Sequence, residues 1–357
     1  MSFAPDPTER LARARADLRM GVPVVLSEGL VVLAVETLTQ DRFDMLGTYG
    51  VPVLAITKWR AETLKAAAYD GDISRIPLPP FATRTWVHSI ADPAGDLNHP
   101  MKGPLKPTRE GPAGPHRAAI ALAKAARLLP AVISVEVFDP AKFATEHNLT
   151  LVSGNGAMPA EVSPMARVIH AGLPMDASEA GRVHIFRPDD GAEEHYAIEI
   201  GHPDRSKPVL TRLHSACFTG DVLGSLKCDC GPQLRGAMAQ MGAEGTGVLL
   251  YLNQEGRGIG LANKMRAYSL QDQGFDTVEA NHRLGFEDDE RDFRIGAEIL
   301  REMGFSQVRL LTNNPAKIAK LESCGLEVTE RVPLEVGKNR HNEAYLATKA
   351  SKSGHLL

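Results

Sequence analysis

Gly247-Val-Leu-Leu-Tyr-Leu252, an uninterrupted apolar run, is followed by the glycine-rich stretch Asn253-Gln-Glu-Gly-Arg-Gly-Ile-Gly260 and then by a helical pattern over Leu261–Gln273. A short apolar run bounded by turn residues is typical of a buried strand. A helical pattern at Glu290–Met303 and a strand pattern at Val308–Thr312 continue the alternation. The sequence therefore predicts a mixed α/β domain in the second half of the chain.

The residues on the amino-terminal side of this stretch also alternate between strand and helix patterns. His184–Phe186, Ala197–Ile200 and Val209–Leu213 indicate strands of an antiparallel meander, and Pro232–Gly242 indicates a helix with proline in its first turn. Further towards the N-terminus, helices are expected at Glu9–Met20, Arg117–Leu128 and Pro140–His147, strands at Val24–Leu26, Leu30–Val35, Val51–Ile56, Ala131–Phe138 and Leu149–Ser153, and a loop at Asp92–His116.

Domain organisation follows from these patterns. Residues 154–181 are rich in small residues and proline without a clear period, so we expect a linker there, with room for a short helix. The predicted fold class is α/β (α+β), with two domains that each contain a mixed sheet and packed helices. The expected boundaries are residues 1–153 for the first domain and 182–357 for the second.

Composition narrows the class of protein. The 357 residues suit two domains of about 100–200 residues each, and the hydrophobic fraction of 43% and charged fraction of 24% are those of a globular chain. A net charge of −4 argues against a nucleic-acid polymer as partner. The sequence has no apolar run of about 20 residues and no signal-peptide pattern, so we expect a cytoplasmic protein without a membrane partner.

Three of the four cysteines lie close together in the sequence. Cys217 precedes the pair Cys228-Asp-Cys230, whereas Cys324 stands alone in a helical pattern, where we expect a buried apolar role. Three thiolates can hold one Zn²⁺ and leave its fourth position open, which is the arrangement of a catalytic site. The alternatives are a structural zinc with a fourth ligand such as His214, or no metal at all.

Weaker signals follow the cysteines. Glu255 and Arg257 on the glycine loop can complement a guanine edge, although an ordinary turn with a surface ion pair would look the same. In Thr312-Asn-Asn-Pro-Ala-Lys317, Asn314 is expected to cap a helix whose first residue is Pro315. The backbone N–H groups at the start of this helix and the side chain of Lys317 can then bind a phosphate. The alternative is a well-capped helix without a ligand. The acidic run Asp288–Asp292 is expected to begin a helix, where acids are ordinary complements of the helix dipole.

Together these residues resemble GTP cyclohydrolase II of riboflavin biosynthesis, from about Arg182 to Leu357. The motifs that carry the resemblance are Cys217-Phe-Thr-Gly-Asp, Cys228-Asp-Cys230-Gly, Gln254-Glu-Gly-Arg257, Asn263-Lys-Met-Arg-Ala-Tyr268, Leu270-Gln-Asp-Gln-Gly274, Asp276-Thr-Val-Glu-Ala-Asn-His282, Asp289-Glu-Arg-Asp292, Leu310-Leu-Thr-Asn-Asn-Pro315 and Gly354-His-Leu-Leu357.

The resemblance implies a homodimer, with one zinc per subunit held by Cys217, Cys228 and Cys230 and with Mg²⁺ bridging the triphosphate of GTP. It implies that Asp289 accepts a proton, that Arg291 is the nucleophile that takes the nucleotidyl group as pyrophosphate leaves, and that Tyr268, which could also simply pack on its helix, lies near the metal. Zinc-bound hydroxide would attack C8 of the imidazole ring and formate would leave, giving 2,5-diamino-6-(5-phospho-ribosylamino)pyrimidin-4-one. Nucleotide contacts are implied for Arg212, Leu213, His214, Ser215, Ala216, Gln233, Glu255, Gly256, Arg257, Thr277, Thr312 and Lys317.

Two positions depart from the family pattern. Ala216 stands where the family has glutamate, and Leu252-Asn253 stands where it has His-Arg. Loss of a phosphate donor weakens triphosphate binding by roughly a few kcal/mol. These departures keep open a second hypothesis, a cyclohydrolase-II-like enzyme of pyrimidine (uracil) catabolism, and a third is a non-catalytic nucleotide-binding protein.

The N-terminal half more distantly resembles 3,4-dihydroxy-2-butanone 4-phosphate synthase, over Arg10–Thr57 and Gly114–Ser153. The acidic stretch that should hold Mg²⁺ is replaced by Ser27–Glu36, and the Gly-His-Thr-Glu motif is replaced by Gly114-Pro-His-Arg117. A site without hard oxygen ligands should not hold Mg²⁺. We therefore expect a degenerate domain that serves as a scaffold or interface.

Overall fold

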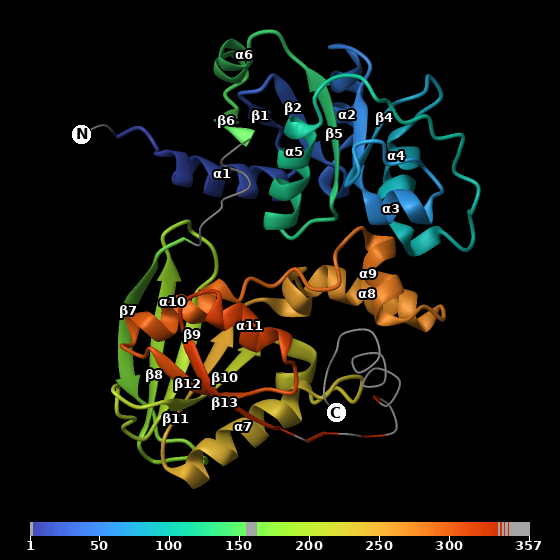
Figure 1. Cartoon of the computed structure of the whole chain (residues 1–357). Helices are drawn as coiled ribbons and strands as arrows, with labels where there is room; N and C mark the ends of the chain where they lie inside the picture. Colours follow the sequence, from blue (N-terminus) through green and yellow to red (C-terminus); the bar gives the residue numbers. More distant parts are fainter. Residues whose placement is uncertain (1–2, 155–162, 335, 338, 340–341, 343–357) are drawn as a thin grey trace. The chain divides into compact units, whose positions relative to one another are not determined.

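A computed structural model of the chain describes residues 3–154, 163–334, 336, 337, 339 and 342 (Figure 1). Residues 155–162 of the expected linker and the terminal motif 354–357 lie outside the described residues. Packing divides the chain into two compact units. Unit 1 comprises Met1–Glu161 and Ala262–Glu290, and unit 2 comprises Val162–Leu261 and Arg291–Leu357. Among the described helices, none has the length and apolarity needed to cross a membrane.

Unit 1 is built on a six-stranded sheet with the strand order β4-β3-β5-β2-β1-β6, in which only β1 and β6 pair in parallel. Its helices are α1 (Pro7–Arg19), α2 (Gln40–Gly47), α3 (Lys58–Thr63), α4 (Arg84–Ala91), α5 (Gly114–Ala125), α6 (Pro140–Glu146), α8 (Leu261–Asp272) and α9 (Thr277–Leu284), with short 3₁₀ turns at η1 (Val35–Thr37) and η2 (Pro93–Gly95). Its strands are β1 (Val24–Leu26), β2 (Leu30–Ala34), β3 (Val53–Thr57), β4 (Ile73–Pro77), β5 (Ala131–Glu136) and β6 (Thr150–Val152).

Helices cover both faces of this sheet. Val24 and Leu26 pack in one apolar cluster with residues of α1 and α5, whereas Val25, which points the opposite way, packs in a second cluster with residues of α2, α3, α4 and α6. Every residue of β2 is consequently buried. A strand that is buried on both faces needs a continuous apolar run rather than an alternating one, which explains the sequence Leu-Val-Val-Leu-Ala of β2.

His116 on α5 is buried against this sheet, with Nε2 3.3 Å from the Ser134 hydroxyl of β5. Burial, reinforced by the positive charge of Arg75, lowers the pKa of His116 to about 4. In the unfolded chain a histidine has a pKa of about 6.5. As the pH falls, the imidazole is therefore protonated in the unfolded chain at a higher pH than in the folded chain. The free energy of unfolding is highest above pH 6.5 and decreases as the pH falls towards 4.

Between pH 6.5 and pH 4, the wild-type histidine should lower the free energy of unfolding by up to about 3 kcal/mol. We therefore expect the free energy of unfolding of His116→Gln to depend less on pH in this range. Urea unfolding at several pH values, followed by tryptophan fluorescence, measures the effect, since both tryptophans, Trp59 and Trp86, lie in unit 1. The exposed His147→Gln is the matched control. Equal slopes for wild type and His116→Gln would contradict the prediction.

Unit 2 is built on a seven-stranded mixed sheet with the strand order β13-β12-β10-β11-β9-β8-β7. β10, β11, β12 and β13 pair in parallel, whereas β11, β9, β8 and β7 pair antiparallel. Its strands are β7 (Met165–Gly172), β8 (Gly181–Pro188), β9 (His195–Ile200), β10 (Val209–Ser215), β11 (Gly247–Leu252), β12 (Gln307–Leu311) and β13 (Glu327–Val332). Its helices are α7 (Cys230–Glu244), α10 (Arg294–Glu302) and α11 (Ala316–Glu322), with a one-turn π-helix η4 (Phe218–Val222) and a 3₁₀ turn η5 (Glu255–Gly258).

The two faces of this sheet again bury separate clusters. Residues of α10 and α11 pack on one face, and residues of α7 pack on the other. The predicted fold class, mixed sheets with packed helices in two parts, is confirmed.

Several predicted elements are wrong in detail. The segment expected to be a linker contains β7, which pairs with β8 but buries only Met165, so no apolar alternation reveals it. The expected meander ends at β9, because β10 pairs in parallel with β11 and β12. The acidic run Asp288–Asp292 precedes α10 rather than beginning it, and Pro315, not Asn314, is the N-cap of α11.

Candidate metal and nucleotide site

Three cysteines meet at the carboxyl end of β10 in unit 2. Cys217 follows the strand, Cys228 lies in the loop after η4, and Cys230 is the first residue of α7. Their sulfur atoms all lie within 4.8 Å of one another, and Cys217 Sγ is 3.8 Å from Cys228 Sγ. The structure thus brings together the three thiols that the sequence selects as metal ligands.

Gly220 in η4 makes room for these sulfur atoms. A Cβ at this position would lie 2.8 Å from Cys228 Sγ, 2.9 Å from Cys230 Cβ and 3.1 Å from Cys217 Sγ. A side chain at this position would therefore push the cysteine side chains out of their present positions. Sequence spacing alone does not show this constraint.

The donor set fits a soft or borderline divalent ion. Contact with the Cys217 thiol is the main reason that the pKa of Cys228 is raised to about 11, and the neighbouring thiols also raise the pKa of Cys230 well above its ordinary value. Three thiolates this close repel one another unless a cation lies between them, and thiolate ligands select zinc over Mg²⁺. Among the described residues, these three thiols form the group that can hold a metal ion.

Asp221 connects the thiol site to the sheet. Its carboxylate accepts hydrogen bonds from the Cys217 backbone N–H at 3.0 Å and from the Tyr251 hydroxyl at 3.0 Å, and its Oδ2 lies 3.0 Å from His214 Nε2. His214 on β10 therefore faces the carboxylate of Asp221 in η4, whereas the metal-binding group found among the described residues consists of the cysteines. The sequence identifies Asp221 only as part of a motif, and its bonds depend on the fold.

The glycine loop lies beside the thiols. The Glu255 carboxylate accepts hydrogen bonds from the backbone N–H of Phe218 at 2.6 Å and of Gly256 at 2.9 Å. Gly256 and Arg257 both have positive φ, at 63° and 62°, which glycine tolerates and arginine rarely adopts. The loop is thus tightly shaped and tied to the residue that follows Cys217; the substrate contacts of Glu255, Gly256 and Arg257 stay predictions.

Basic side chains gather at the same end of the sheet. The guanidinium of Arg212 is buried, donates to the Leu311 carbonyl at 3.0 Å and bonds the Gln233 side chain. Burial lowers the pKa of Arg212 to about 10. Lys317 Nζ donates to the Leu213 carbonyl at 3.2 Å, and Arg291 Nη1 donates to the Ser215 hydroxyl at 3.2 Å.

The ring of Phe293 is a shared platform for these cations. Arg291 Cζ lies 4.9 Å, Lys317 Nζ 5.3 Å and Lys320 Nζ 4.8 Å from its centroid. Cations held near an aromatic face gain electrostatic stabilisation, and their combined charge suits an anion. The sequence does not single out Phe293 or Lys320, because neither carries a recognisable motif.

The remaining predicted site residues are divided between unit 1 and unit 2. Thr312 and Ala216 lie in unit 2, where the Thr312 hydroxyl accepts a hydrogen bond from Asn314 N–H at 3.0 Å. Tyr268, Thr277 and Asp289 belong to unit 1, so their meeting with the thiols at one site stays a prediction. Within unit 1, Lys264 Nζ lies 5.7 Å from the Tyr268 ring centroid.

Two carboxylates of the N-terminal half make structural contacts. The Glu28 carboxylate accepts the Gly154 N–H at 3.0 Å, and the Glu36 carboxylate accepts the Leu129 N–H at 2.8 Å. Arg117 pairs with Asp72 at 2.8 Å. These charged side chains are thus engaged in contacts within unit 1.

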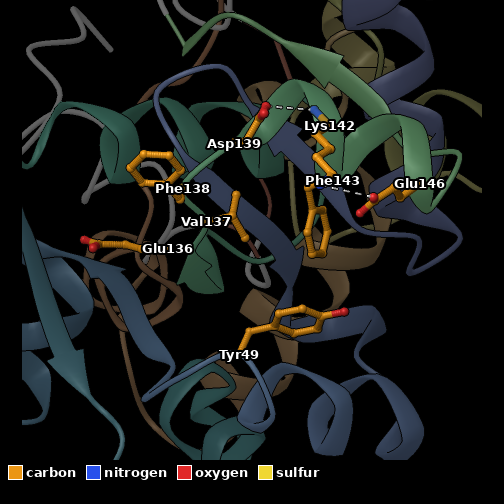
Figure 2. A pocket seen from close by; sticks show the side chains of 8 residues that line it. All are labelled: Tyr49, Glu136, Val137, Phe138, Asp139, Lys142, Phe143 and Glu146. Atoms are coloured by element: carbon orange, nitrogen blue, oxygen red, sulfur yellow. Dashed lines mark hydrogen bonds and ion pairs between the residues drawn. The ribbon is translucent and has the colours of Figure 1, made fainter.

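A hollow of about 320 Å³ opens elsewhere on unit 1, and Figure 2 shows the side chains that surround it. The Tyr49 and Phe143 rings pack edge to face with centroids 5.2 Å apart. None of the predicted site residues lines this hollow; it is bounded by Tyr49, Glu136, Val137, Phe138, Asp139, Lys142, Phe143 and Glu146.

Three thiols that could hold a metal ion, beside basic side chains on a mixed α/β unit, fit the class of metal-binding α/β enzymes. The family profile of GTP cyclohydrolase II matches residues 166–333. A GTP cyclohydrolase-2 of Azospirillum brasilense is 46% identical over 358 residues, which cover 97% of this chain and 93% of that protein. The chain therefore belongs to the GTP cyclohydrolase II family of hydrolases.

Two further relatives differ in how much of this chain they match. A GTP cyclohydrolase-2 of Azotobacter vinelandii is 58% identical over 175 residues, which cover 49% of this chain and 84% of that protein. The riboflavin biosynthesis protein RibBA of Bacillus mycoides is 37% identical over 397 residues, which cover 98% of this chain and 99% of that protein. Similarity thus extends over both halves in some relatives and over about half of this chain in another.

Proposed function

We propose that this chain opens the imidazole ring of GTP by hydrolysis, releases formate and pyrophosphate, and yields 2,5-diamino-6-(5-phospho-ribosylamino)pyrimidin-4-one for riboflavin biosynthesis. The observation that carries the proposal is the meeting of three thiols within 4.8 Å at the end of β10, beside the contact between Arg291 and Ser215. The 46% identity to a GTP cyclohydrolase-2 over nearly the whole chain supports the choice of substrate.

In this proposal, Cys217, Cys228 and Cys230 hold one zinc ion per subunit, and Mg²⁺ accompanies the triphosphate. The zinc supplies a Lewis acid that makes a water molecule nucleophilic at neutral pH. Gly220 leaves room for the three thiols, and Asp221 fixes the backbone of Cys217 through the bond to its N–H.

The basic residues at the end of the sheet bind and orient the triphosphate. Arg291 stands near Ser215 and attacks the α-phosphorus with loss of a guanidinium proton, so that the bond to the β-phosphate oxygen breaks and pyrophosphate leaves. A water molecule then hydrolyses the new bond between nitrogen and phosphorus, which frees Arg291 and the phosphate ester of the product. Asp289 accepts a proton during the reaction, and Tyr268 lies near the metal. The other substrate contacts are assigned to Arg212, Leu213, His214, Ser215, Ala216, Gln233, Glu255, Gly256, Arg257, Thr277, Thr312 and Lys317.

Residues 182–357 form the catalytic domain in this proposal, and residues 1–153 form a degenerate domain without synthase chemistry. Arg117 and its partner Asp72 support this assignment, because an internal ion pair stands at the position of a metal-binding carboxylate. We place the enzyme in the cytoplasm as a homodimer.

The test is to incubate the purified, zinc-loaded chain with GTP and Mg²⁺ and to measure formate, pyrophosphate and the ultraviolet spectrum of the opened ring. Equal amounts of formate and pyrophosphate are expected. Formate without pyrophosphate would contradict the role of Arg291, and the absence of both would contradict GTP as substrate.

A second candidate function is favoured by two departures from the family pattern. Ala216 lacks the usual carboxylate, and the side-chain amide of Asn253, in place of an arginine, donates to the Glu194 carbonyl. A cyclohydrolase-II-like enzyme of pyrimidine (uracil) catabolism would open a different ring. Turnover of a pyrimidine substrate, with no formate from GTP, would select this alternative.

A further inference from the structure

Residues 262–290 leave the cyclohydrolase half and pack with the N-terminal half in unit 1. The segment contains α9 and most of α8, and it carries three residues that the proposed function places at the active site, Tyr268, Thr277 and Asp289. The packing of this segment therefore bears on the chemistry of the other half of the chain.

The first end of the segment is held by polar contacts with N-terminal residues. The Asn263 side chain is fully buried and donates to the Arg127 carbonyl at 3.1 Å. Arg266 Nη2 lies 2.9 Å from the Glu36 carboxylate, which also caps the Leu129 N–H. Two residues of the motif Asn263–Tyr268 thus contact the N-terminal half.

In the middle of the segment, α9 docks on α3 (Figure 1). The rings of Trp59 and His282 stack with centroids 3.8 Å apart and planes 3° apart. The Thr57 hydroxyl donates to the Gly285 carbonyl at 2.8 Å. Gly285 has a φ of +90°, and a Cβ there would lie 2.7 Å from Thr57 Oγ1, so the backbone approaches β3 closely.

A buried charge cluster lies next to this contact. Arg60 is 1% exposed, donates from Nε to the Ile90 carbonyl at 2.6 Å and pairs with Asp96 at 2.5 Å. Arg60 Nη1 also reaches the Arg283 carbonyl at 3.4 Å. The same guanidinium therefore joins α3, α4 and the end of α9.

The last contact falls next to the proposed catalytic residues. Lys124 on α5 places Nζ 2.5 Å from Glu290 Oε1, and this oxygen also accepts the Glu287 N–H at 2.9 Å. Glu290 lies between Asp289 and Arg291 in the sequence. The two contacts of Glu290 tie the stretch that ends at Asp289 and Glu290 to α5 within unit 1.

We infer that Lys124 of the N-terminal half is a positioning residue for the cyclohydrolase reaction, because through Glu290 it sets the placement of the adjacent Asp289. The inference rests on the proposed function, which assigns a role to Asp289. It gives the N-terminal half a part in catalysis without chemistry of its own. A displacement of about 1 Å at reacting groups costs up to roughly 100-fold in rate.

The test compares Lys124→Met with Lys142→Met in the full chain. Lys142 forms an exposed pair with Glu146 on α6, with the two charged atoms 3.8 Å apart, and it does not belong to the proposed site. Lys124→Met is expected to lower kcat for formate release from GTP by about tenfold or more, with zinc content and the KM for GTP little changed. Lys124→Arg is expected to retain most of the rate, and Lys142→Met all of it.

A second measurement does not depend on turnover. Amide hydrogen exchange of peptides spanning residues 284–292 should be faster in Lys124→Met than in Lys142→Met. The exchanged pair Lys124→Glu with Glu290→Lys should recover kcat relative to Lys124→Glu alone, because it restores the ion pair with its charges reversed.

The two proposals fail in different ways. Wild-type protein that releases no formate from GTP overturns the proposed function. Wild-type turnover with an unchanged kcat in Lys124→Met overturns the positioning role, even if exchange at residues 284–292 becomes faster.

Discussion

Cys228→Ser is expected to abolish zinc binding and ring opening together. Cys228 Sγ lies 3.8 Å from Cys217 Sγ in the thiol group, and serine would replace a soft thiolate by a poorly ionised hydroxyl. Losing one of three ligands should weaken zinc binding by more than the roughly 10–100-fold that the loss of a partner outside the ligand set causes. Metal analysis of the purified protein and a formate assay measure both effects.

Cys324→Ser is the matched control for this experiment. Cys324 is partly buried against the core beneath α11 and does not belong to the thiol group. It should keep stoichiometric zinc and full activity. Normal turnover in Cys228→Ser without bound metal would refute the metal site.

Arg291→Ala is expected to stop pyrophosphate release while zinc stays bound. The guanidinium donates to Ser215 at 3.2 Å and lies over the Phe293 ring, but it is not one of the thiol ligands. We expect kcat to fall by at least the roughly 10²–10³-fold that the loss of one transition-state donor causes. A coupled pyrophosphate assay and metal analysis on the same sample separate the two effects.

Two further variants make this result specific. Arg291→Lys keeps the charge but not the planar guanidinium, so it should remain far below wild type if the side chain is the nucleophile. Arg294→Ala removes a nearby guanidinium that pairs with Asp292 at 2.7 Å and should retain activity. Pyrophosphate release at the wild-type rate in Arg291→Ala would show that its assigned role is wrong.

The sequence predicts that the three thiols lie close together, and the structure agrees because the signal is local. Cys217, Cys228 and Cys230 lie close together in the chain, and a strand followed by a turn brings such residues together with few other choices. The strand at Gly247–Leu252 is equally clear, since burial on both faces leaves a continuous apolar run.

Other features depend on contacts between distant residues and leave no local pattern. Seven of the eight residues of β7, all except Met165, are exposed, so its pairing with β8 is invisible in the apolar pattern. Gly220 is explained only by the sulfur atoms around it, and Asp221 only by His214 and Tyr251. The packing of residues 262–290 with the N-terminal half is likewise set by burial rather than by sequence order.

The route of the chain through the two units limits where it can be cut. Removing residues 1–161 would separate the halves at their boundary in the sequence. It would also remove Thr57, Trp59 and Arg60, which contact α9 and the residue after it. The side-chain amide of Asn263, which is now buried, would be exposed to water. A shortened enzyme would need polar residues on the exposed faces of α8 and α9 before it could be expected to stay soluble.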